Sequence, residues 1–352
     1  MPHPPLTFGP VGPELILVGV GIVLLLGEAI WKRVAHWMLA VGALVGIAAA
    51  AVYDITLWNY HGPDTVLGGM VSVDRFAVFS RIVLLGVAAI GVLFGHHYFR
   101  RTGEARGEFY PVLLFCTSGM TLIAAAGNLL IVFLALEILS LSLYVLTGFS
   151  LRLAAVEGAM KYFLLGAFAS AFFLYGIALV YGATGTTSIG GIARELAGRI
   201  GPQPLALAGA GLLAVGFAFK IAAVPFHMWT PDVYQGAPTP ITAYMSAATK
   251  VAAFAALIRV FDVSFQPLAQ DWTPIIWVLA AVTMVVGSIL AIAQTDVKRM
   301  LAYSSVAHAG FILTAITAAN ADGISAALFY LVAYATMIVG AFGVVMLVSI
   351  RG

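Results

Sequence analysis

The sequence contains very little charge. Of its 352 residues, 9% are Asp, Glu, Lys or Arg, and 62% are hydrophobic, whereas a soluble domain has about 25% charged residues. So few charged side chains cannot cover a water-facing surface or supply the basic patch that nucleic-acid binding needs. The composition therefore excludes a soluble globular enzyme, a disordered chain and a nucleic-acid-binding protein.

Cysteine is almost absent as well. Cys116 is the single cysteine and lies in an apolar run, which excludes a disulfide framework and a thiolate set for a zinc or iron–sulfur site. The sequence also has no P-loop, no HExxH and no GxGxxG at a strand-to-helix turn. We therefore expect no metal site, no bound cofactor and no bond-making active site. Residues 1–13 contain no Lys or Arg, so the first apolar segment is expected to be retained rather than cleaved as a signal peptide.

Long apolar segments, in contrast, are abundant. A spanning helix needs about 20 mostly apolar residues, and the sequence has about eleven such segments. Runs such as 129–135 are apolar throughout, unlike the alternating pattern of a barrel strand. The predicted fold is an all-α polytopic membrane protein with about eleven transmembrane helices. The predicted spans are 14–31, 34–53, 75–97, 110–127, 128–150, 157–182, 203–224, 238–261, 274–294, 299–319 and 323–350.

The distribution of Lys and Arg predicts the orientation. With the N-terminus outside, ten cations fall on the cytoplasmic side and five on the other side, which agrees with the excess expected in cytoplasmic loops. An odd number of spans then places the C-terminus in the cytoplasm. The ten are Lys32, Arg33, Arg100, Arg101, Arg106, Arg152, Lys161, Lys298, Arg299 and Arg351, and the five are Arg75, Arg81, Arg194, Arg199 and Arg259.

One stretch interrupts the helical pattern. Residues 225–240 contain four prolines in sixteen residues, so no continuous helix can cross them. Irregular backbone near membrane depth is tolerated only where protein or a water-filled cavity satisfies its polar groups. The sequence therefore predicts a turn or an interrupted helix, with Pro225, His227 and Pro231 as candidate lining of a polar path.

Three ionisable residues are expected far from the ends of their spans. At 1.5 Å per residue, Glu137 lies about 14 Å and Lys250 about 18 Å along its span, and Lys220 lies just before the proline-rich stretch. Such groups are costly in a membrane unless they face a partner or water. Glu137 is either part of a proton path or a structural carboxylate between helices. The lysines either take part in the path or extend their ammonium groups to the interface.

A proton relay is the functional interpretation of these residues. A carboxylate opposite a buried lysine holds a proton on it, and separating the pair releases that proton. Lys161 is a further candidate near Glu137, although a role in setting the topology fits equally well. His308 is a candidate because imidazole accepts and donates protons near neutral pH; the alternative is a core histidine bonded to a nearby Ser or Tyr.

Four runs of the sequence resemble a known family. The runs are FLALEILSLSLYVL at 133–146, KYFLLGAFASAFFLYGIAL at 161–179, FKIAAVPFHMWTPDVYQGAPTPITA at 219–243 and DVKRMLAYSSVAHAG at 296–310. They are similar to the subunit N family of bacterial NADH-quinone oxidoreductase, respiratory complex I, within the broader group of antiporter-like membrane subunits. With the matching order of spans, the resemblance covers essentially the whole chain.

The resemblance implies a subunit that moves protons in the membrane arm while other subunits transfer electrons from NADH to quinone. It implies no redox cofactor on this chain, a place in the bacterial inner membrane, and other membrane-arm subunits as partners, including antiporter-like ones. Glu137, Lys220 and Lys250 match the family's membrane-embedded glutamate and two lysines. NADH and quinone would be used by the complex rather than bound here.

The resemblance also implies a division of the chain. Residues 1–109 correspond to an N-terminal three-helix region, residues 110–262 to a first antiporter-like repeat with a broken seventh helix, and residues 263–352 to part of a second, inverted repeat. Family members usually have about fourteen helices, so the second repeat is expected to be incomplete. The sequence is then a fragment, the product of a shortened gene, or one of two polypeptides that together complete the fold.

Three other functions are compatible with the sequence. Related antiporter complexes share the glutamate and the lysines, so a Na⁺/H⁺ or K⁺/H⁺ antiporter subunit is one alternative. The equivalent subunit of a related complex with another electron donor is a second alternative. The third is a structural membrane scaffold in which the buried charges only hold helices together.

Overall fold

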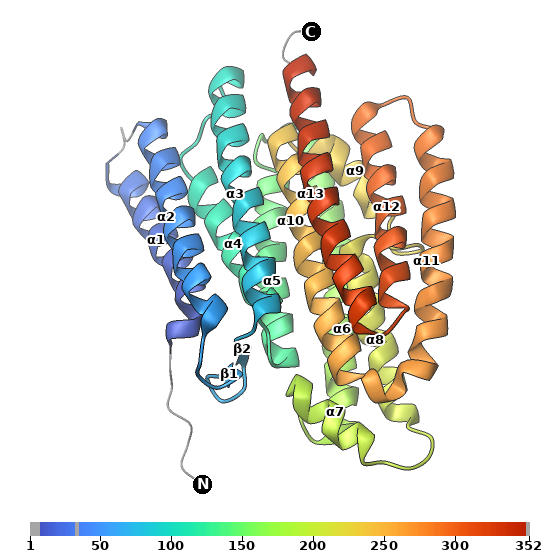
Figure 1. Cartoon of the computed structure of the whole chain (residues 1–352). Helices are drawn as coiled ribbons and strands as arrows, with labels where there is room; N and C mark the ends of the chain where they lie inside the picture. Colours follow the sequence, from blue (N-terminus) through green and yellow to red (C-terminus); the bar gives the residue numbers. More distant parts are fainter. Residues whose placement is uncertain (1–7, 32–34, 350–352) are drawn as a thin grey trace.

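The chain folds into a bundle of long, roughly parallel and antiparallel helices (Figure 1). The computed structural model describes residues 8–31 and 35–349. Within these residues the helices are α1 (Gly12–Ile30), α2 (His36–Thr56), α3 (Arg75–Thr102), α4 (Phe109–Ala124), α5 (Leu129–Thr147), α6 (Leu153–Thr184), α7 (Ile189–Ala197), α8 (Pro204–Ile221), α9 (Trp229–Gly236), α10 (Thr239–Ile258), α11 (Ala269–Ile292), α12 (Val297–Ile316) and α13 (Ala321–Ser349). An antiparallel hairpin of β1 (Thr65–Val66) and β2 (Val71–Ser72) joins α2 to α3.

The predicted all-α membrane fold is confirmed. In the described part of the chain, nine helices are long and apolar enough to cross a membrane, and α4 is a shorter apolar helix. The remaining long helix, α12, packs between α11 and α13. Each of these eleven helices corresponds to one predicted span.

One helix starts earlier than its apolar pattern indicates. The predicted span begins at Pro274, but α11 begins at Ala269 and contains Pro274 within it. Gln270 and Asp271 extend the helix beyond the apolar window, so hydropathy alone misses its first turn. A short 3-10 turn from Gln266 to Leu268 leads into it.

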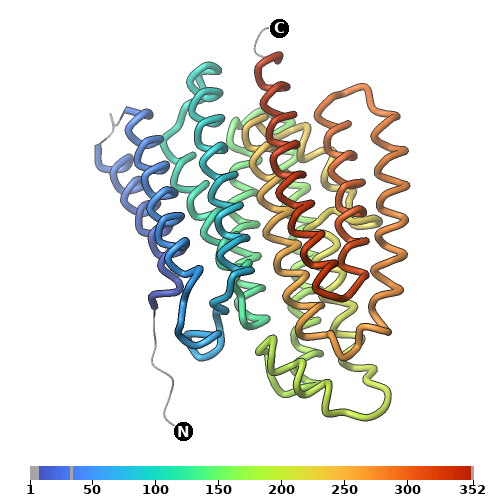
Figure 2. Tube along the Cα trace, in the orientation of Figure 1, coloured from blue at the N-terminus to red at the C-terminus, as the bar shows by residue number. Residues whose placement is uncertain are grey.

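The proline-rich stretch interrupts a helix, as predicted. Helix α8 ends at Ile221, and Ala222 after it adopts a left-handed conformation with φ of 60°. Helix α9 then forms a separate short segment before α10 begins at Thr239. In the tube view these segments lie together in the yellow part of the bundle (Figure 2). The carbonyl of Ile221, the last residue of α8, is therefore free of the helical hydrogen bond that a continuous helix would give it.

Helix α10 lies in the interior of the bundle. All of its residues are buried, and it packs against α3, α4, α8 and α13. Its neighbour α8 packs closely against α6. A Cβ atom added to Gly209 would lie 3.0 Å from the Gly176 carbonyl oxygen, so only glycine fits at this crossing. Small residues at such a crossing let two helices approach, and this brings the polar residues of α6 near those of α8.

Two cations expected in outer loops are buried instead. Arg81 has no exposure, and Arg259 is 8% exposed. Both make ion pairs inside the protein, so neither is a loop charge, and the outer count falls from five to three. Lys32, Arg33 and Arg351 lie outside the described residues. Helix α1 begins and α13 ends at opposite ends of the bundle (Figure 1).

Candidate functional site

Glu137 lies in the middle of α5 and faces α6. The side chain of Asn128 caps α5 by accepting a hydrogen bond from the Leu130 amide, which starts the helix nine residues before Glu137. The carboxylate is half-buried, and the Ser170 hydroxyl of α6 donates to its Oε1. An acid in the middle of a spanning helix thus has one neutral hydrogen-bond partner from the neighbouring helix.

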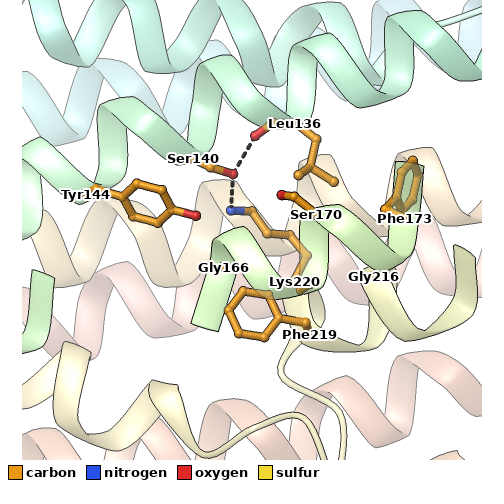
Figure 3. A pocket seen from close by; sticks show the side chains of 10 residues that line it. Leu136, Ser140, Tyr144, Gly166, Ser170, Phe173, Gly216, Phe219 and Lys220 are labelled. Atoms are coloured by element: carbon orange, nitrogen blue, oxygen red, sulfur yellow. Dashed lines mark hydrogen bonds between the residues drawn. The ribbon is translucent and has the colours of Figure 1, made fainter. Parts of the chain in front are cut away.

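Lys220 lies at the end of α8, where its ammonium group contacts neutral oxygens. The residue is 3% exposed. Its Nζ donates to Ser140 Oγ at 2.8 Å and to Tyr162 Oη at 3.1 Å, and Ser140 Oγ donates to the Leu136 carbonyl (Figure 3). The ammonium also lies 5.2 Å from the centre of the Tyr162 ring, within the range of a cation–π contact.

A small cavity lies beside the Lys220 ammonium. Ser140, Tyr144, Ser170 and Lys220 contribute its polar lining, together with apolar residues of α5, α6 and α8 (Figure 3). The volume open to the centre of a water molecule is about 10 Å³, close to what a single water needs. Because Ser170 bonds to Glu137 and Ser140 bonds to Lys220, this cavity connects the surroundings of the acid to those of the lysine.

Lys250 contacts the broken end of α8. The residue is 2% exposed, and its Nζ donates to the Ile221 carbonyl oxygen at 2.7 Å. Ile221 is the last residue of α8, so the helix interruption supplies this acceptor. Lys220 and Lys250 are therefore linked through adjacent residues of one helix end.

A direct ion pair between Glu137 and a buried lysine, which the relay interpretation invokes, is not formed. In the described part of the chain, no carboxylate oxygen lies within 4.0 Å of the Lys220 or Lys250 ammonium. Serine hydroxyls and the cavity separate the acid from Lys220 instead. Transfer between them therefore requires a bridging hydroxyl or water.

Lys161 lies away from Glu137, whereas one of its two interpretations places it nearby. Its Nζ contacts Asp232 at 2.7 Å and Glu157 at 2.8 Å, and Asp232 also pairs with Arg299 at 2.6 Å. Ser170, which contacts Glu137, is nine residues further along α6, or about 13 Å. Lys161 therefore belongs to an ion-pair network that ties α6, α9 and α12 together.

His308 makes the contact expected for a core histidine. Its Nδ1 lies 2.7 Å from the Tyr330 hydroxyl of α13, and the ring is half-buried. The nearby Tyr334 hydroxyl donates to Ser305 at 2.8 Å. Among the described residues, no hydrogen bond joins His308 to Lys250.

The predicted lining residues of the broken helix do not face the Lys220 cavity. Pro225 is exposed and borders an apolar groove between α6, α8 and the loop before α9. His227 is half-buried, with its ring centre 6.3 Å from that of Tyr303. Pro231 is buried in α9. The interruption acts at this site through its backbone, which frees the Ile221 carbonyl, rather than through these side chains.

Sequence reasoning missed the hydroxyl groups that surround Lys220. Ser140 follows Glu137 by three residues, so both lie on one face of α5, and this spacing is a signal that identifies it. Ser170 and Tyr162 are polar residues in an apolar helix, but their sequence positions do not show which helix they face. The contacts of these two residues depend on how α6 packs against α5 and α8.

The chain matches a family model described as NADH:quinone oxidoreductase/Mrp antiporter, transmembrane, over residues 126–352. It is 46% identical over 343 residues to NADH-quinone oxidoreductase subunit N of Trichlorobacter lovleyi, covering 97% of this chain and 70% of that protein. It is 45% identical over 397 aligned positions to subunit N of Rhodococcus opacus, covering 99% of this chain and 73% of that protein. The chain belongs to the subunit N family of NADH-quinone oxidoreductase.

Solved structures agree with membership of the subunit N family. A chain of respiratory complex I from Thermus thermophilus with bound aureothin is 38% identical, with a TM-score of 0.76, and the match covers 95% of this chain and 70% of that one. A chain of the archaeal membrane-bound sulfane sulfur reductase is 26% identical, with a TM-score of 0.81, 96% coverage of this chain and 71% of that one. A chain of the Mrp complex of Dietzia shares the fold, with a TM-score of 0.81 at 20% identity over 97% of this chain and 65% of that one.

These likenesses place the chain among bacterial membrane proteins of the antiporter-like fold, with a broken seventh helix formed by α8 and α9. The subunit N relatives are parts of an enzyme complex named for NADH and quinone. In residues 8–31 and 35–349, no group of three or more His, Cys, Asp or Glu is arranged to hold a metal ion.

Proposed function

We propose that this chain moves protons across the membrane as a subunit of the membrane arm of NADH-quinone oxidoreductase. In this proposal the chain binds no redox cofactor, and other subunits carry electrons from NADH to quinone. Its partners are the other membrane-arm subunits, including antiporter-like ones, and the lipid bilayer. The proposed orientation has the N-terminus outside and the C-terminal end of α13 on the cytoplasmic side.

The observation that carries the proposal is the environment of Lys220. Its buried ammonium is held by two hydroxyls rather than by a carboxylate. Loss of its proton therefore breaks no ion pair and leaves no unpaired buried anion, which would be costly. A buried lysine in this environment is suited to alternate between charged and neutral states.

The contacts suggest a sequence of transfers. Glu137 receives a proton and passes it through Ser170 or a water in the cavity toward Ser140, and Lys220 accepts it at Nζ. Lys220 then gives up the proton, and a neutral Lys250 accepts it at Nζ, which lies at the same end of α8 against the Ile221 carbonyl. Release from Lys250 proceeds toward α12 and α13, where His308 and Tyr330 form the next polar pair. Lys161 enters the proposal as a partner of Asp232 that holds α6 against α9.

The degree of likeness favours NADH as the electron source and protons as the transported ion. Identity reaches 46% with a subunit of NADH-quinone oxidoreductase, but is 26% with a sulfane sulfur reductase chain. The 20% identity to an Mrp chain supports a common fold alone.

Replacing Glu137 with Gln in the assembled complex tests the proposal. Glu137→Gln keeps the hydrogen bond from Ser170 but cannot carry a proton, so we expect normal assembly and a clear loss of protons pumped per electron. The matched control is Glu108→Gln, because Glu108 is exposed at the start of α4. Normal pumping per electron in Glu137→Gln would contradict the proposed role. Proton movement driven by a sodium gradient, without NADH oxidation, would favour the antiporter alternative.

A further inference from the structure

A second group of buried charges lies outside the proposed proton path. Glu14 of α1, Asp54 of α2 and Arg81 of α3 meet inside the N-terminal part of the bundle, and we call them the Arg81 cluster. Arg81 NH2 lies 2.9 and 3.0 Å from the two Glu14 carboxylate oxygens. Arg81 NH1 lies 3.4 Å from Asp54 Oδ1. The three side chains are 0–6% exposed.

The Arg81 cluster has one more acid than it has bases. A guanidinium does not give up its proton in proteins, so two ionised carboxylates would leave a net negative charge. Such a charge inside a membrane protein is unfavourable unless a further cation neutralises it. Only a cation on an element packed around the cluster could neutralise that charge.

None of the surrounding helices supplies it within the described residues. Helix α10 packs against α3 and carries Lys250, whose ammonium donates to the Ile221 carbonyl of α8. Helix α13, which also contacts α3, contains no Lys, Arg or His.

Helix α4 contains no charged residue or histidine and presents the Thr121 hydroxyl, which bonds to the Ser118 carbonyl. The other carboxylate of α1, Glu28, is fourteen residues away, or about 21 Å. On α2, the Tyr53 hydroxyl bonds to the Gly9 carbonyl, and His36 is at the far end.

The other charged groups of α3 and of the segment before it either contact other residues or lie far from the Arg81 cluster. Arg75 lies against the Trp58 ring, at 5.8 Å from its centre. The other ionisable residues of α3 lie at the opposite end of the helix, fifteen or more residues beyond Arg81. They are the two histidines, Tyr98 and the last two arginines. Asp74, just before α3, pairs with Arg259 through two hydrogen bonds. The excess of one carboxylate over Arg81 is therefore local.

Several polar atoms at the cluster lack a partner. Glu14 Oε1, Asp54 Oδ2, Arg81 Nε and the hydroxyl of the adjacent Ser80 are buried and form no hydrogen bond within the described part of the chain. Glu14 Oε1 nevertheless lies 2.9 Å from Arg81 NH2. An ionised carboxylate oxygen without a donor is costly to bury, whereas a protonated one is less so. Asp54 also makes the longer contact with Arg81. Asp54 Oδ2 is therefore the position where a proton is best accommodated.

We propose that the Arg81 cluster is a proton-binding site, with one proton held by its two carboxylates and carried on Asp54 while Glu14 stays ionised against Arg81. Arg81 is six residues into α3, about 9 Å from its start, so the site lies near the membrane face that carries the β1–β2 hairpin. It is separate from Glu137, Lys220 and Lys250 and does not depend on their proposed function.

Infrared difference spectroscopy of the purified complex tests the proposal directly. With Asp54→Asn the protonated acid is removed. With Glu14→Gln, Asp54 becomes the sole carboxylate facing Arg81 and ionises. Both variants are therefore expected to lose the same carbonyl band of a protonated carboxylic acid relative to the wild type. Asp74→Asn is the matched control. Asp74 is the single acid paired with Arg259, so it is ionised and this variant should lose no such band.

Assembly of the subunit into membranes gives a second, independent measurement. Because one carboxylate is already neutral, each single variant is expected to assemble within about twofold of the wild type. The double variant Glu14→Gln/Asp54→Asn leaves Arg81 without an anion and is expected to assemble at least about tenfold less. Unchanged acid bands in both single variants would overturn the proposal. So would single variants that assemble as poorly as the double variant, since both carboxylates would then be ionised.

Discussion

Two groups of buried charge in this bundle are held in different ways. In the Arg81 cluster, opposite charges touch, and the guanidinium is surrounded by acids from two other helices. In the path from Glu137 to Lys250, charged groups meet hydroxyls and a backbone carbonyl. A charge neutralised by an opposite charge joins helices firmly, while a charge solvated by neutral groups can appear and disappear without leaving a partner unpaired.

Removing the guanidinium should have the largest effect on stability. Arg81→Ala leaves Glu14 and Asp54 buried without a cation, and breaking such a pair costs about 3–5 kcal/mol. We expect a severe loss of assembled subunit, measured by its amount in membranes and by thermal unfolding of the purified complex. Arg81→Lys keeps the charge and should assemble better than Arg81→Ala. Normal assembly of Arg81→Ala would remove the distinction between the two groups.

Removing the buried ammonium should affect transport rather than assembly. Lys220→Met keeps an unbranched side chain, one atom shorter than lysine, and leaves no carboxylate unpaired, so the subunit is expected to assemble. Proton translocation should fall by at least about tenfold, measured as protons pumped per electron. Lys161→Met, at the end of the bundle, is the lysine control and should lose less. If Lys220→Met assembled as poorly as Arg81→Ala, Lys220 would be structural.

A smaller effect is expected from the hydroxyl that holds the ammonium. Ser140→Ala removes an acceptor of a hydrogen bond from a charged group, which contributes about 1.5–3 kcal/mol, and should slow translocation several-fold. Ser142→Ala is the matched control two residues along α5, because the exposed Ser142 hydroxyl bonds within its own helix. Equal rates in the two variants would show that Ser140 does not take part in transfer.

The smallest effect at neutral pH is expected at the pair between Asp74, which precedes α3, and Arg259, which follows α10. Burial acts to raise the pKa of Asp74, but the hydrogen bonds and charge of Arg259 outweigh it and lower the pKa. The ordinary pKa of Asp is about 4. The pair therefore contributes stability fully above about pH 4, and this contribution is lost as the pH falls through the lowered pKa.

Thermal unfolding of the complex between neutral and acidic pH measures this contribution. In the Asp74→Asn variant, the unfolding temperature is expected to fall less between neutral and acidic pH than in the wild type. Asp64→Asn is the control, because Asp64 is exposed and forms no ion pair in the described part of the chain. A wild-type acid dependence in Asp74→Asn would mean that the pair does not contribute through charge.

The spans and the helix interruption were predictable because each depends on local composition. Each of the eleven apolar segments formed a helix, and α8 ended before the proline-rich stretch as expected. Lys220 and Lys250 were singled out from their places in apolar segments, and both are buried in the protein. The start of α11 was not, because Gln270 and Asp271 are polar although helical.

Partners were much less predictable than positions. One interpretation placed Lys161 near Glu137, but it pairs with Asp232, and Arg81 was placed in an outer loop but lies among acids. In both cases the partner comes from a helix that is distant in the sequence. Hydropathy and spacing along one helix contain no information about which face of another helix will pack against it.

By itself, the sequence determined that this protein is an all-α membrane bundle with a break after α8 and a few deeply placed ionisable residues. It did so because the length of apolar runs and the chemistry of proline act within a few turns of one chain segment. Only the tertiary structure decided that Lys220 meets Ser140 and Tyr162, that Lys250 meets the end of α8, and that Arg81 meets two acids. These contacts depend on helix packing, which brings together residues 27 to 80 positions apart.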